Sequence, residues 1–226
     1  MGRAEVDEQF ARMLLAPTGG GVRTKVDWGG SHGMFQVRIH GRGGQGVVTA
    51  AELLSLAAFR EGRYAQAFPS FGSERTGAPL AAFCRIDTRQ IRTREPVAEP
   101  DAVVVQDATL LHHVDVFAGL SDEGYALINS RRSLEQLGLA GLAEHRRRER
   151  LLTVPASDSA REYTGHARPN AALLGALAAL TGVVSLESVT DAINIRFDGE
   201  LARANAAAAA ACSALVRARL GALAHA

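Results

Sequence analysis

The sequence predicts an α/β protein whose core is a Rossmann-like, mostly parallel sheet flanked by helices. First, an alternating strand pattern from Phe35 to His40 reaches a glycine-rich turn, and a helical run follows from about Val47 to Arg60. Second, two short apolar runs, AVVVQ at 102–106 and YALIN at 125–129, are typical of strands buried on both faces. Strands joined by crossovers imply a parallel sheet with right-handed connections.

Length and composition limit the class of protein. The 226 residues suffice for one large α/β domain with appendages. Lys and Arg number 25 against 24 for Asp and Glu, a balance that favours neither nucleic acid nor a membrane surface as partner. No run of about 18 uninterrupted apolar residues occurs, so no membrane-spanning helix is expected. The absence of a disulfide framework fits a cytoplasmic protein.

The chain is expected to divide into an N-terminal extension, residues 1–34, and one domain, residues 35–226. The extension is either disordered or an arm that orders against a partner, with Trp28 as its anchor. Within the domain, further strands are expected at 63–68, 80–86 and 151–154, and a helical turn at 110–117. A capping box at Ser133 to Gln136 predicts a short helix, and the charged run 144–150 is expected to be a solvated face.

The last third of the chain is expected to form helices on the sheet. Asn170 is predicted to cap a helix over 171–180 that Gly182 closes. Two further helices are expected over 185–195 and 200–222, the latter containing a run of alanines that permits close helix packing.

The glycine-rich turn is the first candidate binding element. Gly41, Gly43 and Gly46 fit G-x-G-x-x-G between a strand and a helix, with Arg42, Gly44 and Gln45 completing the turn. Such a turn exposes backbone N–H groups, and the helix amino terminus favours phosphate. Alternatively, the glycines only permit close strand–helix packing. An NAD site is disfavoured, because Glu61 ends the helix and the second strand ends without a carboxylate.

A second polar segment, Ser70 to Gly77, follows the second predicted strand and should lie at the same sheet edge. Its candidate ligand contacts are Ser73, Arg75 and Thr76, and whether Glu74 or Arg75 faces the ligand stays open. Asn129 ends another strand and Arg168 precedes a helix, so both are expected near this edge.

Catalysis by this chain alone is not supported by the sequence. No G-x-S-x-G elbow is present and the histidines show no triad spacing, so no catalytic residue is predicted. Cys84 lies in a predicted strand and is expected to be buried. Cys84 and Cys212 cannot by themselves hold an iron–sulfur cluster or a structural zinc ion, and no metal ligand is predicted.

The stretch HGRGGQGVVTAAELLSLAAFREGRYAQAFPSFGSERTGAPLAAFCRI resembles the gamma subunits of the 2-oxoacid:ferredoxin (acceptor) oxidoreductases. The similarity continues through EPDAVVVQDATLL, VDVFAGL and GYALINS, returns at RPNAALLGAL and VSLESVTDAI, and covers roughly residues 35–200. FPSFGSERTGAP is its most specific part. The long N-terminal extension is a departure from the family pattern.

The resemblance implies a role that spacing alone does not show. The family oxidatively decarboxylates a 2-oxoacid to an acyl-CoA. Thiamine diphosphate and Mg are held by alpha and beta subunits, and [4Fe-4S] clusters by beta and ferredoxin-like subunits. A further electron-transfer subunit is an additional candidate partner. The gamma part is associated with coenzyme A, so both loops, Asn129 and Arg168 would face that co-substrate. The oxoacid and the final acceptor, ferredoxin or NAD, stay open.

Two other functions remain as alternatives at this point. One is a stand-alone Rossmann-like nucleotide-binding protein. The other is a purely structural subunit whose ligand site is vestigial.

Overall fold

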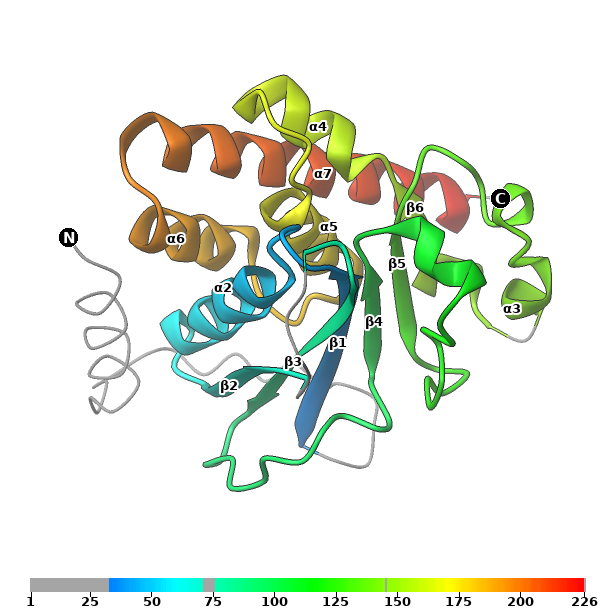
Figure 1. Ribbon diagram of the computed structural model, residues 1–226, viewed down its shortest axis with the longest axis horizontal. Coiled ribbons are helices and arrows are strands. Elements are labelled where there is room, and N and C mark those ends of the chain that lie inside the picture. The colour runs from blue at the N-terminus through cyan, green and yellow to red at the C-terminus, as the bar shows by residue number, and fades with distance from the viewer. Residues whose placement is uncertain (1–32, 71–75, 145, 226) are drawn as a thin grey trace.

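The computed structural model describes residues 33–70, 76–144 and 146–225, which form a six-stranded mixed sheet with helices (Figure 1). The predicted N-terminal extension, residues 1–34, therefore lies almost wholly outside the described residues. The strands are β1 (Met34–Arg42), β2 (Tyr64–Pro69), β3 (Pro79–Asp87), β4 (Ala102–Val105), β5 (Tyr125–Asn129) and β6 (Leu151–Val154). The α-helices are α2 (Val47–Arg60), α3 (Ala140–Glu144), α4 (Ala156–Thr164), α5 (Asn170–Thr181), α6 (Leu186–Arg196) and α7 (Gly199–Ala224). Three short 3-10 helices are η1 (Ala108–His112), η2 (Glu135–Leu137) and η3 (Arg148–Arg150).

The sheet confirms the predicted mostly parallel architecture, and one strand, β3, departs from the parallel arrangement. The strand order is β2-β3-β1-β4-β5-β6. β1, β4, β5 and β6 pair in parallel, whereas β3 is antiparallel to both β1 and β2. β2 therefore points the same way as β1, although β3 lies between them. The carboxyl ends of β1 and β2 consequently meet at the same edge of the sheet, as the sequence predicts for the two loops.

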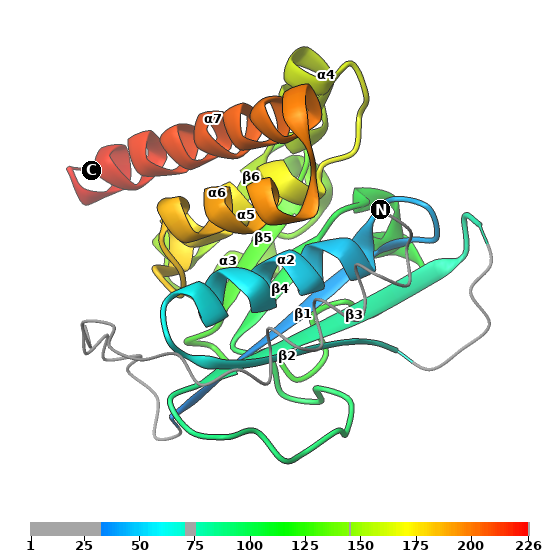
Figure 2. The same ribbon diagram turned by 90° about the vertical axis from the view of Figure 1, so that its left-hand side faces the viewer.

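The two faces of the sheet are covered differently. α2 and α5 pack on one face, and α7 lies outside α5 as a further layer, as Figure 2 shows. The opposite face is covered over β4 and β5 by η1 and the segments after it, through a smaller core that contains Val103, Val105, Leu110 and Ile128. β4 is buried along its whole length, which explains its unbroken run of β-branched residues.

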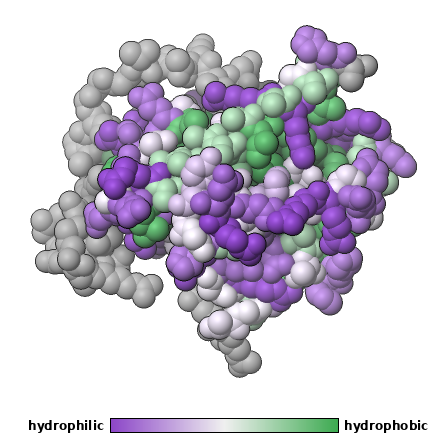
Figure 3. Space-filling view, turned by 90° about the horizontal axis from the view of Figure 1, so that it is seen from above, coloured by the Kyte–Doolittle hydropathy of each residue, from purple (hydrophilic) through white to green (hydrophobic). Residues whose placement is uncertain are grey.

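α7 packs close to α5 because of one glycine. A Cβ at Gly175 of α5 would lie 2.0 Å from the carbonyl oxygen of Ala209 in α7, so no side chain fits there. α7 also exposes Leu201 and Leu215, and the face seen in Figure 3 carries a band of hydrophobic residues. Among the described helices, α7 alone is long and apolar enough to cross a membrane by length and composition. A core helix passes the same test, and α7 packs along α5, α4 and α6.

Several local predictions are confirmed and others are wrong. The capping box forms, since Ser133 Oγ accepts from Gln136 N at 3.3 Å and Gln136 Oε1 accepts from Ser133 N at 2.9 Å. Asn170, by contrast, is the first residue of α5 and its side chain does not cap the helix, because Pro169 occupies the N-cap position. α4 was not predicted, because this helix is mostly polar and lacks a long apolar stripe.

The charged run at 144–150 is not simply a solvated face. Arg146 donates to the carbonyl oxygens of Leu120 at 2.7 Å and Ser121 at 3.1 Å. The Arg150 guanidinium lies 4.9 Å from the ring centroid of Tyr125 and pairs with Glu123 at 3.1 Å. These arginines therefore fix the turn before β5, where unpaired backbone carbonyls need donors.

Candidate functional site

The candidate site lies outside the carboxyl ends of β1 and β4. These strands are parallel neighbours, but the chain leaves β1 towards α2 on one face and leaves β4 towards η1 on the other. Such a reversal of direction opens a crevice at the sheet edge, and ligands of open α/β sheets bind in crevices of this kind. The glycine-rich turn, residues 43–46, lies at this edge.

The turn presents the amino terminus of α2 without a capping side chain. Gly46 holds φ +75° at the N-cap position, and among the described residues no side chain hydrogen-bonds the first turn of the helix. The first intrahelical donor is Ala50 N, at 2.9 Å from Gly46 O. The amides of Val47, Val48 and Thr49 therefore precede the helical ladder and, with the helix dipole, favour an anion.

The turn also brings two helix amino termini together. A Cβ at Gly46 would lie 2.7 Å from Asn170 Nδ2 at the start of α5, and one at Gly41 would lie 2.6 Å from Val47 Cγ2. The glycines at 41 and 46 thus permit close packing, as the packing interpretation of the motif predicts, and ligand access to the turn stays a prediction.

The second loop is joined to the first through backbone hydrogen bonds. Gly43 N donates to Ala78 O at 3.0 Å and Gly77 N donates to Gly43 O at 3.1 Å, and Gly43 pairs with Thr76 in a parallel bridge. Thr76 is exposed at this position. Ser73 and Arg75, with Glu74, lie outside the described residues. The expected pairing of the two loops is therefore seen at residues 76–78.

Arg42 joins the ends of three segments. Its Nε lies 3.1 Å from Asp107 Oδ2, its Nη1 donates to Gly77 O at 3.1 Å, and its Nη2 donates to Thr109 Oγ1 at 2.8 Å. The guanidinium thus connects the end of β1 to the second loop and to η1. Asp107 was not among the predicted residues, although a polar residue directly after a buried strand was a usable signal.

The Gln45 side chain also turns inward. Its Oε1 accepts from Arg42 N at 2.8 Å and its Nε2 donates to Asp107 Oδ2 at 2.9 Å. Burial disfavours the charged Asp107 carboxylate. However, hydrogen bonds from Thr109 and Gln45 and the charge of Arg42 outweigh burial and hold the pKa of Asp107 below its ordinary value. The anionic Asp107 therefore binds both Arg42 and Gln45.

Asn129 and Arg168 lie at the same edge in different settings. Asn129 Oδ1 accepts from Ser157 N at 3.0 Å, and its Nδ2 donates to Gln106 O at 2.8 Å and Ser157 Oγ at 2.7 Å. It therefore ties β4 and β5 to the first turn of α4. Arg168 precedes α5 and is exposed. Its guanidinium makes no hydrogen bond to a side chain within the described ranges.

Gln106, which follows β4, was not among the predicted site residues. Its side chain is 2% exposed, and within the described structure neither its Nε2 nor its Oε1 has a hydrogen-bond partner. The Gln106 Cβ lies 3.3 Å from the position of a Cβ at Gly41 and so faces the α2 side of the crevice. A buried amide ordinarily makes hydrogen bonds, so Gln106 is an additional polar side chain to consider at this crevice.

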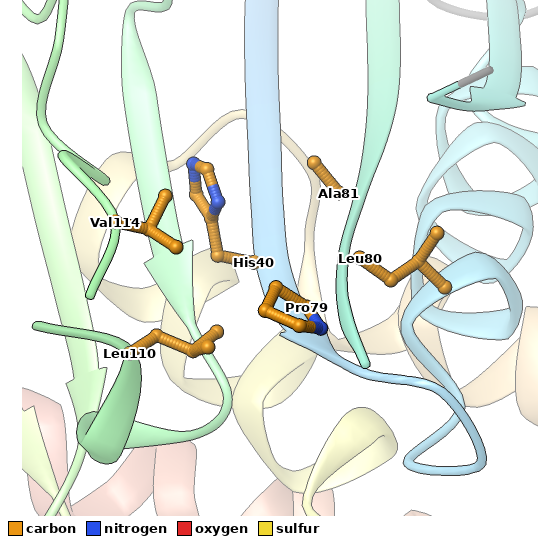
Figure 4. Close-up of a pocket in the computed structure, with 6 residues that line it drawn as sticks. All are labelled: His40, Pro79, Leu80, Ala81, Leu110 and Val114. Carbon is orange, nitrogen blue, oxygen red and sulfur yellow. The ribbon is translucent and has the colours of Figure 1, made fainter. Parts of the chain in front are cut away.

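On the other face, His40 lines a cavity of about 170 Å³ beside the same strand ends (Figure 4). Its Nε2 accepts from Arg38 Nε at 3.0 Å. Burial, reinforced by the charge of Arg38, lowers the pKa of His40 to about 4, with Asp115 opposing the shift. His40 is consequently neutral near pH 7.

Neither cysteine is poised for chemistry. Cys84 and Cys212 are free and buried, and burial raises the pKa of both thiols. Within the part of the chain that the structure describes, no three His, Cys, Asp or Glu side chains are grouped so as to hold a metal ion. Glu61 accepts from Ser185 N at 2.7 Å at the start of α6, so it is not placed for a nucleotide ribose.

Comparison with known proteins decides the family. The model of the pyruvate ferredoxin/flavodoxin oxidoreductase family matches residues 36–215. The chain belongs to this family. The resemblance to gamma subunits drawn from the sequence is confirmed by the relatives as well. One of them, the pyruvate/ketoisovalerate oxidoreductases common subunit gamma of Pyrococcus furiosus, is 51% identical over 176 residues, or 78% of this chain and 94% of that protein.

Two solved structures share the fold. Pyruvate oxidoreductase subunit PORC from Thermotoga maritima superposes with a TM-score of 0.68 at 36% identity, covering 81% of this chain and 97% of that one. The 2-oxoglutarate:ferredoxin oxidoreductase from Magnetococcus marinus has 2-oxoglutarate, coenzyme A and succinyl-CoA bound. It superposes with a TM-score of 0.58 at 16% identity, over 86% of this chain and 32% of that longer chain, which shows likeness of fold alone.

Proposed function

We propose that this chain is the gamma subunit of a multisubunit 2-oxoacid oxidoreductase that depends on thiamine diphosphate and iron–sulfur clusters, and that it contributes coenzyme A binding and assembly. The observation that carries the proposal is the 51% identity to a pyruvate/ketoisovalerate gamma subunit over nearly all of that relative. The reaction is the oxidative decarboxylation of a 2-oxoacid to an acyl-CoA, and pyruvate and ketoisovalerate are the first substrates to test.

The paired loops support coenzyme A as the ligand of this chain. The uncapped amides of α2 and the exposed Arg168 can receive phosphate oxygens, and Thr76 adds a hydroxyl at the bridge between the loops. Arg42 already holds the loops together through Gly77, so in this proposal it chiefly positions them. Coenzyme A, when bound, supplies the thiol that takes up the acyl group, and this chain holds and orients it.

The remaining cofactors are assigned to partner subunits. The described residues do not fit a [4Fe-4S] cluster, because the cysteines are buried and far apart in sequence. They also contain no group of three His, Cys, Asp or Glu side chains that could hold Mg for thiamine diphosphate. The proposed partners are therefore alpha and beta subunits and a ferredoxin-like subunit, with a further electron-transfer subunit as an additional candidate. We place this hetero-oligomer in the cytoplasm, with no nucleic acid or membrane as partner.

A purely structural role is the second candidate, favoured by the inward hydrogen bonds of Arg42 and Gln45. Substitutions at two glycines of similar geometry distinguish the structural role from ligand binding. Gly44 (φ +89°) lies in the turn and Gly138 (φ +75°) ends η2, and a Cβ at either would meet no atom within 4 Å. A valine at either is equally strained. If the chain binds coenzyme A through the turn, we expect Gly44→Val to weaken coenzyme A binding and Gly138→Val to leave it unchanged.

Reconstitution tests both candidates. The chain is combined with its partner subunits, and 2-oxoacid-dependent reduction of ferredoxin is measured with and without coenzyme A. We expect activity to require this chain and to fall in Gly44→Val but not in Gly138→Val. Full activity without the chain would refute the proposal, and loss of assembly with unchanged coenzyme A affinity would establish a scaffold role.

A further inference from the structure

The cavity beside His40 has one polar group in an apolar wall. It is bounded by the face of β1 and β3 and by the segment from η1 to Val114, as Figure 4 shows. The lining residues are His40, Pro79, Leu80, Ala81, Leu110 and Val114. At about 170 Å³ the cavity is below the size of sites for whole drug-sized ligands. It therefore suits one portion of a larger molecule.

The hydrogen-bonding character of His40 is fixed by Arg38. Because Arg38 Nε donates to His40 Nε2, that nitrogen is an acceptor, and the neutral ring must carry its proton on Nδ1. Nδ1 has no hydrogen-bond partner among the described residues and is not shut off from solvent. His40, which lines the cavity, therefore carries a single N–H donor, on Nδ1.

Arg38 itself is not free to bind a ligand. The other N–H groups of its guanidinium donate to backbone carbonyl oxygens, those of Val97, Ala98, Val116 and Ala118. All five donors of the guanidinium are therefore used. The cavity thus lacks an available cation, and a carboxylate or phosphate is disfavoured there. A branched apolar group next to a neutral carbonyl satisfies both the walls and the donor.

The cavity adjoins the loop site. Leu110 follows Thr109, which binds Arg42, and Pro79 pairs with Arg42 across β1 and β3. Pro79 also follows Ala78, whose carbonyl accepts from Gly43 in the glycine turn. The loop site and the cavity therefore share neighbouring residues at the end of β1, the start of β3 and η1.

We propose that this cavity receives the pantoyl amide segment of coenzyme A, with its two methyl groups against Leu110, Val114 and Ala81 and its amide carbonyl accepting from His40 Nδ1. The proposal rests on coenzyme A being the ligand of the loop site. In this proposal His40 positions the pantetheine arm. The face of the sheet opposite α2 then contributes to coenzyme A binding.

Titration of the two halves of coenzyme A tests this assignment in the full chain. Val114→Phe fills the cavity from its outer wall, and Ala81→Leu fills it from β3. Leu111→Phe is the matched control, since Leu111 is a partly buried neighbour of the same small core that does not line the cavity. Dissociation constants are measured for coenzyme A, pantetheine and adenosine 3′,5′-bisphosphate.

We expect both cavity-filling variants to weaken coenzyme A and pantetheine by about tenfold, with adenosine 3′,5′-bisphosphate changed by less than about twofold. Leu111→Phe should leave all three ligands unaffected. If the cavity-filling variants bind coenzyme A as wild type does, or lose coenzyme A and the bisphosphate together, the assignment of the cavity is wrong. The coenzyme A site at the loops would be unaffected by that result. A wild-type chain that binds neither coenzyme A nor the bisphosphate, free or assembled, refutes the coenzyme A site itself.

Discussion

Neutral, buried His40 should make the protein lose stability on mild acidification. Its pKa is about 4 in the folded protein against 6.5 for the free side chain, so below about pH 6.5 the unfolded chain takes up a proton that the folded chain refuses. The contribution of His40 to stability is therefore complete above pH 6.5 and is lost as the pH falls towards 4. The shift corresponds to about 3 kcal/mol in total, of which about 2 kcal/mol is lost between about pH 7.5 and 5.

Urea unfolding of wild type and His40→Gln at these two pH values measures the effect. Glutamine retains an acceptor for Arg38 but does not titrate, so we expect the variant to lose about 2 kcal/mol less than wild type on acidification. His225→Gln, at the exposed end of α7, is the control and should follow wild type. If wild type and His40→Gln lose the same free energy of unfolding, within about 0.5 kcal/mol, the burial and neutrality of His40 are wrong.

Two further predictions concern packing. Gly175→Ala should destabilise the protein by about 3 kcal/mol, because the new methyl group meets the Ala209 backbone. Gly221→Ala, in open space on α7, is the control and should stabilise the protein by up to about 1 kcal/mol. Thermal unfolding compares the two variants, and equal effects would contradict the α5–α7 contact. Cys84 should resist thiol reagents in the native protein and react only on unfolding, because burial raises its pKa; rapid native labelling would show that β3 is exposed.

The sequence was sufficient for the strands of the sheet and for the placement of both loops at one edge. Period-two alternation located β1, and an unbroken run of valines located β4, because these patterns follow directly from burial on one or both faces. The placement of both loops at one edge followed from strand direction. It held even though β3 is inserted between β1 and β2, since two antiparallel pairings restore the direction of β2.

Side-chain partners could not be predicted, because they depend on which segments meet in space. Arg42 and Gln45 were expected to face a ligand, but Asp107, more than sixty positions along the chain, binds both of them. Asn170 looked like a helix cap, yet Pro169 takes that position. His40 was assigned only to a strand, because its role depends on Arg38 and on the loops that Arg38 binds.

Hydrogen–deuterium exchange on the assembled complex, with and without coenzyme A, tests most directly whether this chain binds the co-substrate through its glycine turn. We predict slower exchange at residues 43–49, the turn and the uncapped first turn of α2, with no change in the distant half of α7. Protection confined to the partner subunits, with residues 43–49 unchanged, would contradict the account.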